Sequence, residues 1–247
     1  MISHSYLKKK YKFEPKDICY IGANEGQELP EMIKQFPDSK IYFFEPQEKP
    51  FRILKNKFRE YENILFYNFA LGEVNKKVEM YVNNNNQNMS SSILEPKEHT
   101  VHHPDVTFSG LEEIDQKRFS DLGILDADYL NLDTQGYELQ ILKGFDNLDD
   151  INFIKTEINR KEIYKSNTLV KDLDNYLKTY GFIRVETIWF RKKILWGEAF
   201  YVKKSKISFL EFLTKKVKYR IQGIKGYFWI LSRLVDLNLI RRDKNIL

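Results

Sequence analysis

The sequence has little cysteine and no long apolar run. Its 247 residues include one cysteine, Cys19, so no disulfide framework can form within the chain. Cys19 stands inside an apolar run, which favours a small buried side chain over a catalytic thiolate. The longest unbroken apolar stretch, residues 227–231, is far shorter than the ~20 residues that span a membrane, and no apolar segment follows the first lysines as it would in a secretory signal. These absences predict a protein of the cytoplasm.

Acidic residues are scarce only toward the end of the chain. The net charge is +5, and the surplus of lysine and arginine lies beyond residue 202, so the preceding part is slightly acidic. With 42% hydrophobic residues, the length suits one α/β domain and an appendage. We therefore predict a domain over residues 1–204 and a basic tail over 205–247. An acidic domain argues against nucleic acid as a partner.

Short apolar runs alternate with helical patterns through the predicted domain. We expect parallel strands at residues 17–21, 41–44, 64–68, 127–133 and 152–158. Helices are expected at 27–36, 50–60, 136–144 and 168–180, with Gly144 just after the third of them as its C′ residue. A closing antiparallel hairpin is expected from 182–187 and 198–203. The succession predicts βαβ units and a seven-stranded, mainly parallel sheet, with an extra strand near 78–82 outside it.

Residues 83–110 interrupt this alternation. They include four consecutive asparagines, Ser90–92 and three of the four histidines, with apolar residues such as Met89 and Ile93 among them. Connections of this length inside a compact domain are usually active-site lids or insertions. We expect a lid-like loop here, after which the chain resumes with a helix near 111–122.

The turn after the first strand is the most informative part of the sequence. Gly22 and Gly26 permit a positive φ and a close approach of the backbone to a ligand, and Glu45 stands at the tip of the next strand, where a ribose hydroxyl pair is held. Asn24 occupies the place of the middle glycine of a dinucleotide fingerprint. The pattern favours S-adenosylmethionine, an adenosine with an amino-acid tail, over a dinucleotide. An ordinary strand-to-helix turn is the alternative.

Several short motifs follow each other through the predicted domain. They are GANEG (22–26), FEP (44–46), NFALG (68–72), MSSS (89–92), NLDTQGYE (131–138) and WGEA (196–199). In this order they resemble the FkbM family of S-adenosylmethionine-dependent methyltransferases. The resemblance implies a class I methyltransferase fold, which is Rossmann-like with helices on both faces of the sheet, and transfer of a methyl group to a hydroxyl oxygen.

The resemblance also implies which residues hold the cofactor. Gly22, Asn24 and Gly26 would line its methionine part, and Glu45 would hold the ribose. Asn68 and Ala70, after the third strand, would flank the adenine, and Ser91 of the lid-like loop completes the set. For Asn68 the alternative is a turn residue with an Asx hydrogen bond.

Methylation of a hydroxyl requires a base that accepts its proton. We predict Asp133, Glu157 and His102 for this role, with His99 and His103 as further candidates. Asp133 could instead cap a helix beginning near residue 135, and a histidine pair before Pro104 could be a solvated loop pair. Asp133, Glu157 and a histidine could also hold a divalent ion, but no ligand spacing supports this, so no metal is predicted.

The basic tail carries apolar residues at helical spacing between Leu210 and Val235, with its basic residues off that stripe. Such a helix could lie on an anionic bilayer at the inner face of the membrane, or pack on the domain or on a second copy of the chain. The preferred acceptor is a sugar hydroxyl of a surface polysaccharide or lipid-linked glycan. The alternatives are a small-molecule or polyketide hydroxyl, and a non-catalytic module that binds a ligand and docks to a membrane.

Overall fold

The structure, a computed structural model, describes residues 1–83, 89–102, 104–124, 127–146, 148–190 and 196–207. These residues form one compact unit, Met1–Lys206. The predicted tail lies almost entirely outside the described residues, so its role stays a prediction. Among the residues that are described, no helix is long and apolar enough to cross a membrane.

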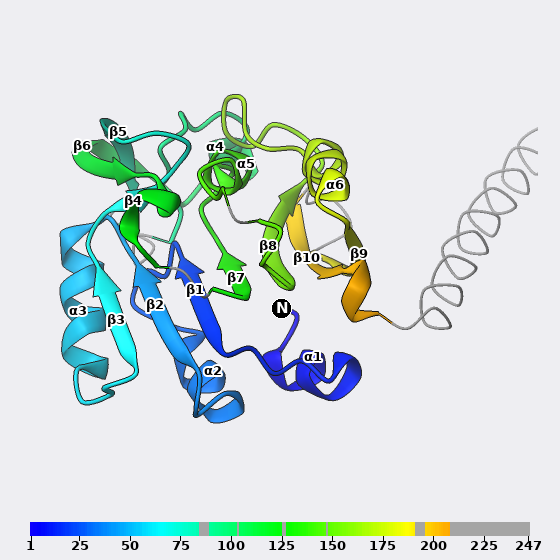
Figure 1. Ribbon diagram of the computed structural model, residues 1–247. Helices are drawn as coiled ribbons and strands as arrows, with labels where there is room; N and C mark the ends of the chain where they lie inside the picture. Colours follow the sequence, from blue (N-terminus) through cyan, green and yellow to red (C-terminus); the bar gives the residue numbers. More distant parts are fainter. Residues whose placement is uncertain (84–88, 103, 125–126, 147, 191–195, 208–247) are drawn as a thin grey trace, which may run out of the picture. The chain divides into compact units, whose positions relative to one another are not determined.

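A seven-stranded sheet forms the centre of the domain (Figure 1). Its strands are, in spatial order, β3 (Ile64–Tyr67), β2 (Lys40–Phe44), β1 (Asp17–Ile21), β7 (Tyr129–Leu132), β8 (Phe153–Asn159), β10 (Trp196–Lys203) and β9 (Phe182–Trp189). The first five strands of this order are parallel, and β10 runs antiparallel to both of its neighbours. The predicted seven-stranded, mainly parallel sheet with a closing hairpin is therefore confirmed. Because the strand order reverses between β1 and β7, a crevice is expected at their carboxyl ends.

Helices cover both faces of this sheet. They are α1 (His4–Tyr11), α2 (Leu29–Gln35), α3 (Glu48–Phe58), α5 (Glu138–Leu142) and α6 (Val170–Thr179), with a short α4 (His99–His102) and 3-10 turns at Phe119–Leu122 and Lys204–Lys206. On one face, side chains of α5 and α6 join a core that includes the fully buried Cys19. On the other face, Phe13 packs edge-to-face against Phe36, Tyr129 and Phe153. Both faces of the strands are thus buried, which is why the strands read as continuous apolar runs.

A second, three-stranded sheet replaces a helix that the sequence predicts. Residues 111–122 carry apolar side chains at roughly helical intervals, but β6 (Phe108–Lys117) is a strand that pairs antiparallel with β5 (Lys76–Asn83) and parallel with β4 (Ala70–Leu71). The helix prediction is wrong because β5 needs a partner for its backbone groups, and this pairing outweighs the local spacing. In Figure 1 the small sheet lies at the end of the main sheet toward which β1, β2 and β3 point.

Gly144 has a different role from the one predicted. It follows α5, but it is not among the residues with a positive φ, as a left-handed C′ glycine would be. Instead, a Cβ on Gly144 would lie 2.2 Å from the carbonyl oxygen of Gly72. A glycine at this position lets the end of α5 pack directly on the turn after β4.

We expect Gly144→Ala to lower the free energy of unfolding by about 1–3 kcal/mol, because the added methyl group forces two backbone segments apart. Thermal unfolding measures the effect. Gly110→Ala is the matched control, since a Cβ there meets no atom within 4 Å. Equal melting temperatures for the two variants would contradict the packing role of Gly144.

Candidate active site

A large cavity lies at the strand-order reversal. It holds about 940 Å³ of empty space when its open mouth is included. Residues from the turns after β1, β2, β3 and β7 line it, and Met89, Ser91 and Ile93 of the predicted lid-like loop contribute to its wall. The cavity is thus built where the sequence places its candidate residues.

The turn after β1 is shaped by its glycines. Gly22 has φ +77°, and a Cβ there would lie 1.9 Å from the carbonyl oxygen of Asp133. Only glycine therefore lets the end of β1 approach the end of β7 so closely. Asn24 lines the cavity with φ +48°. Gly26 (φ +74°) does not line it; a Cβ there would lie 2.7 Å from Cδ1 of Leu54.

Glu45 is held by backbone donors at one side of the cavity. Its carboxylate accepts 2.8 Å hydrogen bonds from the backbone N–H groups of Asn24 and Gln47, one on each oxygen. Burial raises the pKa of Glu45 to about 7, although both hydrogen bonds act in the opposite direction. Each oxygen keeps a lone pair that can accept a further hydrogen bond from a ligand.

The structure separates the predicted adenine-side residues. Ala70 and Ser91 line the cavity, whereas Asn68 does not. The Asn68 amide donates 3.0 Å hydrogen bonds to the carbonyl oxygens of Glu45 and Pro46. Asn68 therefore braces the loop that carries Glu45, and these two bonds cross to another segment, unlike those of an Asx turn.

Asp133 and Glu157 are neighbours, and only Asp133 reaches the large cavity. Asp133 lines both that cavity and a smaller adjoining hollow, whereas Glu157 is 8% exposed and lines the hollow alone. The two carboxyl groups are hydrogen-bonded to each other. Burial, together with the charge of Asp133, raises the pKa of Glu157 well above its usual value. Burial raises the pKa of Asp133 as well, but hydrogen bonds from Glu157 and Gln135 oppose that shift, so Glu157 is the member of the pair that takes up a proton first.

The other roles considered for the predicted bases were a helix cap for Asp133 and a loop position for the histidines. The helix after β7 begins at Glu138 with Tyr137 as its N-cap, so Asp133 does not cap it. His99 is buried, with its ring centroid 5.2 Å from that of Tyr164. His102 is the last residue of α4, and its side chain and the whole of His103 are outside the described part of the structure. His99 does not line the cavity, and the prediction for His102 stays a prediction.

No group of three or more histidine, cysteine, aspartate or glutamate side chains is arranged to hold a metal ion in the part of the chain that the structure describes.

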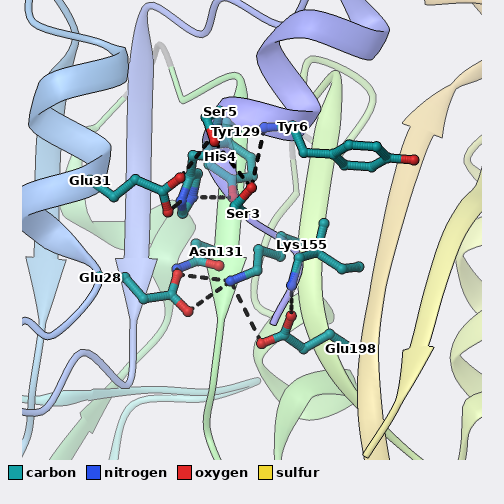
Figure 2. A network of polar contacts seen from close by, with 11 residues as sticks. Ser3, His4, Ser5, Tyr6, Glu28, Glu31, Tyr129, Asn131, Lys155 and Glu198 are labelled. Carbon is teal, nitrogen blue, oxygen red and sulfur yellow. Dashed lines mark hydrogen bonds and ion pairs between the residues drawn. The ribbon is translucent and has the colours of Figure 1, made fainter.

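Lys155 lies at the centre of a buried ionic cluster that was not predicted from the sequence. Its ammonium lies 2.8 Å from both carboxylate oxygens of Glu28 and 3.8 Å from Oε1 of Glu198, and Asn131 donates to Glu28. Figure 2 shows the ammonium between the two carboxylates. Because Glu28 also lines the large cavity, the cluster fixes one of its walls. A charged residue inside the apolar run of β8 was the signal that could have revealed it.

His4, in the N-terminal segment, is also buried (Figure 2). Its ring nitrogen Nε2 lies 3.1 Å from the hydroxyl of Tyr129. Burial, with the nearby charge of Lys155 as a second cause, lowers the pKa of His4 to about 4, so this histidine is neutral at pH 7.

Comparisons of the sequence and of the fold with known proteins all point to methyltransferases. The sequence matches the model of the methyltransferase FkbM domain over residues 21–184. It is 22% identical over 176 residues to the 2-O-methyltransferase NoeI of Sinorhizobium fredii (strain NBRC 101917 / NGR234). The aligned region covers 67% of this chain and 72% of NoeI. Among solved structures, methyltransferase FkbM from Methylobacillus flagellatus KT is similar with a TM-score of 0.54 and 17% identity, over 81% of this chain and 46% of that one. This chain thus spans about half the length of that structure, and the likeness concerns the fold.

Proposed function

The chain belongs to the FkbM family of methyltransferases, and on that premise we propose that it methylates a hydroxyl oxygen on a sugar of a surface polysaccharide or lipid-linked glycan. The methyl donor of the family is S-adenosylmethionine. The observation that carries the proposal is one cavity with Glu45 on the tip of β2 and Asp133 on the tip of β7.

The residues of the cavity fit this cofactor. The free lone pairs of Glu45 suit the two hydroxyl groups of a ribose, which donate hydrogen bonds to a carboxylate. Apolar side chains of Leu71 and Ile93 line the same cavity and suit the faces of an adenine ring. Gly22 and Asn24 would then face the methionine part, as the sequence predicts.

Asp133 supports a proton-accepting role because it is the carboxylate at the cavity wall next to a protonated neighbour. Bound S-adenosylmethionine supplies a methyl group on a positively charged sulfur, which makes that methyl group electrophilic. A neutral hydroxyl is a weak nucleophile, so Asp133 takes the proton that the acceptor oxygen loses. Glu157 does not line this cavity, and it would act by donating a hydrogen bond to Asp133.

Transfer to an oxygen is supported by the relative NoeI, whose name describes a 2-O-methyltransferase. A sugar presents several hydroxyl groups, and the wall of the cavity offers both carboxylates and neutral polar groups such as Ser91 and Gln135 to them.

An acceptor screen tests the proposal. The purified full chain is incubated with S-adenosylmethionine and, in separate reactions, with nucleotide sugars, oligosaccharides, lipid-linked glycans and small polyketide alcohols. We expect S-adenosylhomocysteine release that depends on a glycan acceptor, with a mass gain of one methyl group on the sugar. Methylation of the polyketide alcohols alone, or no acceptor-dependent release in any reaction, would contradict it.

A further inference from the structure

Gln135 connects the two carboxyl groups of the site. Its side-chain nitrogen Nε2 donates to Oδ1 of Asp133 at 2.9 Å and to Oε2 of Glu157 at 2.8 Å. Both amide hydrogens are thereby committed to the pair that the proposed reaction uses. Burial raises the pKa of Asp133, and the hydrogen bond from Gln135 opposes this shift, because an amide donor stabilises the ionised form of a carboxylate.

The opposite end of the same amide is fixed by Tyr164. The Tyr164 hydroxyl lies 3.1 Å from Oε1 of Gln135 and 2.9 Å from the carbonyl oxygen of Ser90. Burial raises the pKa of Tyr164 well above its usual value, so the hydroxyl remains a donor. The single hydroxyl hydrogen is shared between these two acceptors, and Oε1 faces it. Nε2 then faces the carboxyl groups, since the reversed amide would place its oxygen against a carboxylate.

The backbone of Gln135 is held in an unusual conformation. Its φ is +55°, in the left-handed region that residues other than glycine, asparagine and aspartate seldom adopt. Its carbonyl oxygen accepts a 3.0 Å hydrogen bond from the hydroxyl of Ser92, in the segment that contributes to the cavity wall. Such strain persists at functional sites when surrounding contacts determine the conformation.

We propose that Gln135 is a positioning residue, whose side-chain amide holds the carboxylate of Asp133 toward the cavity in the ionised state and is itself oriented by Tyr164. This inference rests on the proposed function, in which Asp133 accepts the proton of the acceptor. Other groups act on the pair as well: Glu28 before α2, Lys155 on β8, Glu138 on α5 and Glu198 on β10. They are unchanged in the variants below.

The test is a pH titration of carboxyl groups by NMR on the full chain with 13C-labelled aspartate and glutamate, in which Asp133→Asn identifies the Asp133 signal. Gln135→Gly removes the amide and is compatible with the positive φ. Tyr164→Phe keeps the ring and removes the hydroxyl. Gln140→Ala is the matched control, because the Gln140 amide contacts Thr168 rather than the carboxyl pair.

We expect the titration midpoint of Asp133 to move upward in Gln135→Gly, to move less in Tyr164→Phe and to stay in place in Gln140→Ala. Once the acceptor screen has identified a compound that the protein methylates, we expect kcat of Gln135→Gly with that compound to fall at least about 10-fold. KM for S-adenosylmethionine should change less than about twofold. An unmoved Asp133 midpoint in folded Gln135→Gly overturns the inference, and so does an unchanged kcat. If that variant does not fold, an unmoved midpoint in Tyr164→Phe decides against it. Because the titration needs no acceptor, failure of the proposed function is recognised separately, by the acceptor screen.

Discussion

Replacing Asp133 by asparagine is expected to lower kcat of methyl transfer about 10³-fold, with little change in the affinity for S-adenosylmethionine. Asparagine keeps the size and the hydrogen-bonding oxygen of the side chain but cannot accept a proton at neutral pH. Asp133 lines the cavity beside Glu157, whose pKa burial and the charge of Asp133 raise well above its usual value. Single-turnover rates and calorimetric binding, measured on the same preparations, separate the two effects.

The matched control for this prediction is Asp128→Asn. Asp128 lies at the opposite end of β7, where it accepts hydrogen bonds from the backbone of Lys16 and Asp17. An asparagine oxygen can accept the same bonds, so kcat should be unchanged. Glu157→Gln should fall between the two variants, because Glu157 reaches the acceptor only through Asp133. A rate for Asp133→Asn within threefold of the unmodified chain would remove Asp133 from the mechanism.

Replacing Glu45 by alanine is expected to raise Kd for S-adenosylmethionine about 100-fold. A hydrogen bond to a charged group contributes ~1.5–3 kcal/mol, and the ribose offers two hydroxyl groups to this carboxylate. The exposed Glu48, in the first turn of α3, gives the matched control Glu48→Ala, for which no change in Kd is expected. Isothermal titration calorimetry measures both variants. Equal affinities would place the ribose elsewhere.

The raised pKa of Glu45 adds a dependence on pH. Its value of about 7 in the folded protein exceeds the ordinary value of 4.5, so the folded state binds this proton more tightly than the unfolded chain does. This contribution to folding stability is greatest below pH 4.5, decreases as pH rises toward 7 and is constant above. Cofactor binding has the opposite trend, because the ribose requires the ionised carboxylate. Kd should therefore fall as pH rises toward 7, and Glu45→Gln should abolish that slope.

The main sheet could be predicted from the sequence because its strands are buried on both faces and end abruptly at glycine or polar residues. The order of the seven strands of the main sheet along the chain, and of the helices α2, α3, α5 and α6 between them, follows from that alternation. The strand β6 could not be predicted from the sequence, since Leu111, Ile114 and Leu122 have spacings compatible with a helix. Its pairing with β5 is a contact between distant segments. Local spacing carries no information about such a partner.

The candidate site shows the same division between local and distant information. Glu45 and Asp133 directly follow strands, and Asn24 lies in the turn after β1, so topology brings them to one cavity. Asn68 also directly follows a strand and Gly26 lies in the same turn as Asn24, but Asn68 binds the loop after β2 and Gly26 packs against α3. Gln135 was visible only as part of a motif, because its role depends on Tyr164, which follows it by many residues and meets it only in the fold.

The most direct test of the account is a crystal structure of the full chain with S-adenosylhomocysteine. We expect both ribose hydroxyl groups within hydrogen-bonding distance of the Glu45 carboxylate, the adenine between Leu71 and Ile93, and the sulfur on the side of the cavity that Asp133 lines. A nucleoside bound without contact to Glu45, or a sulfur turned away from Asp133, would contradict it.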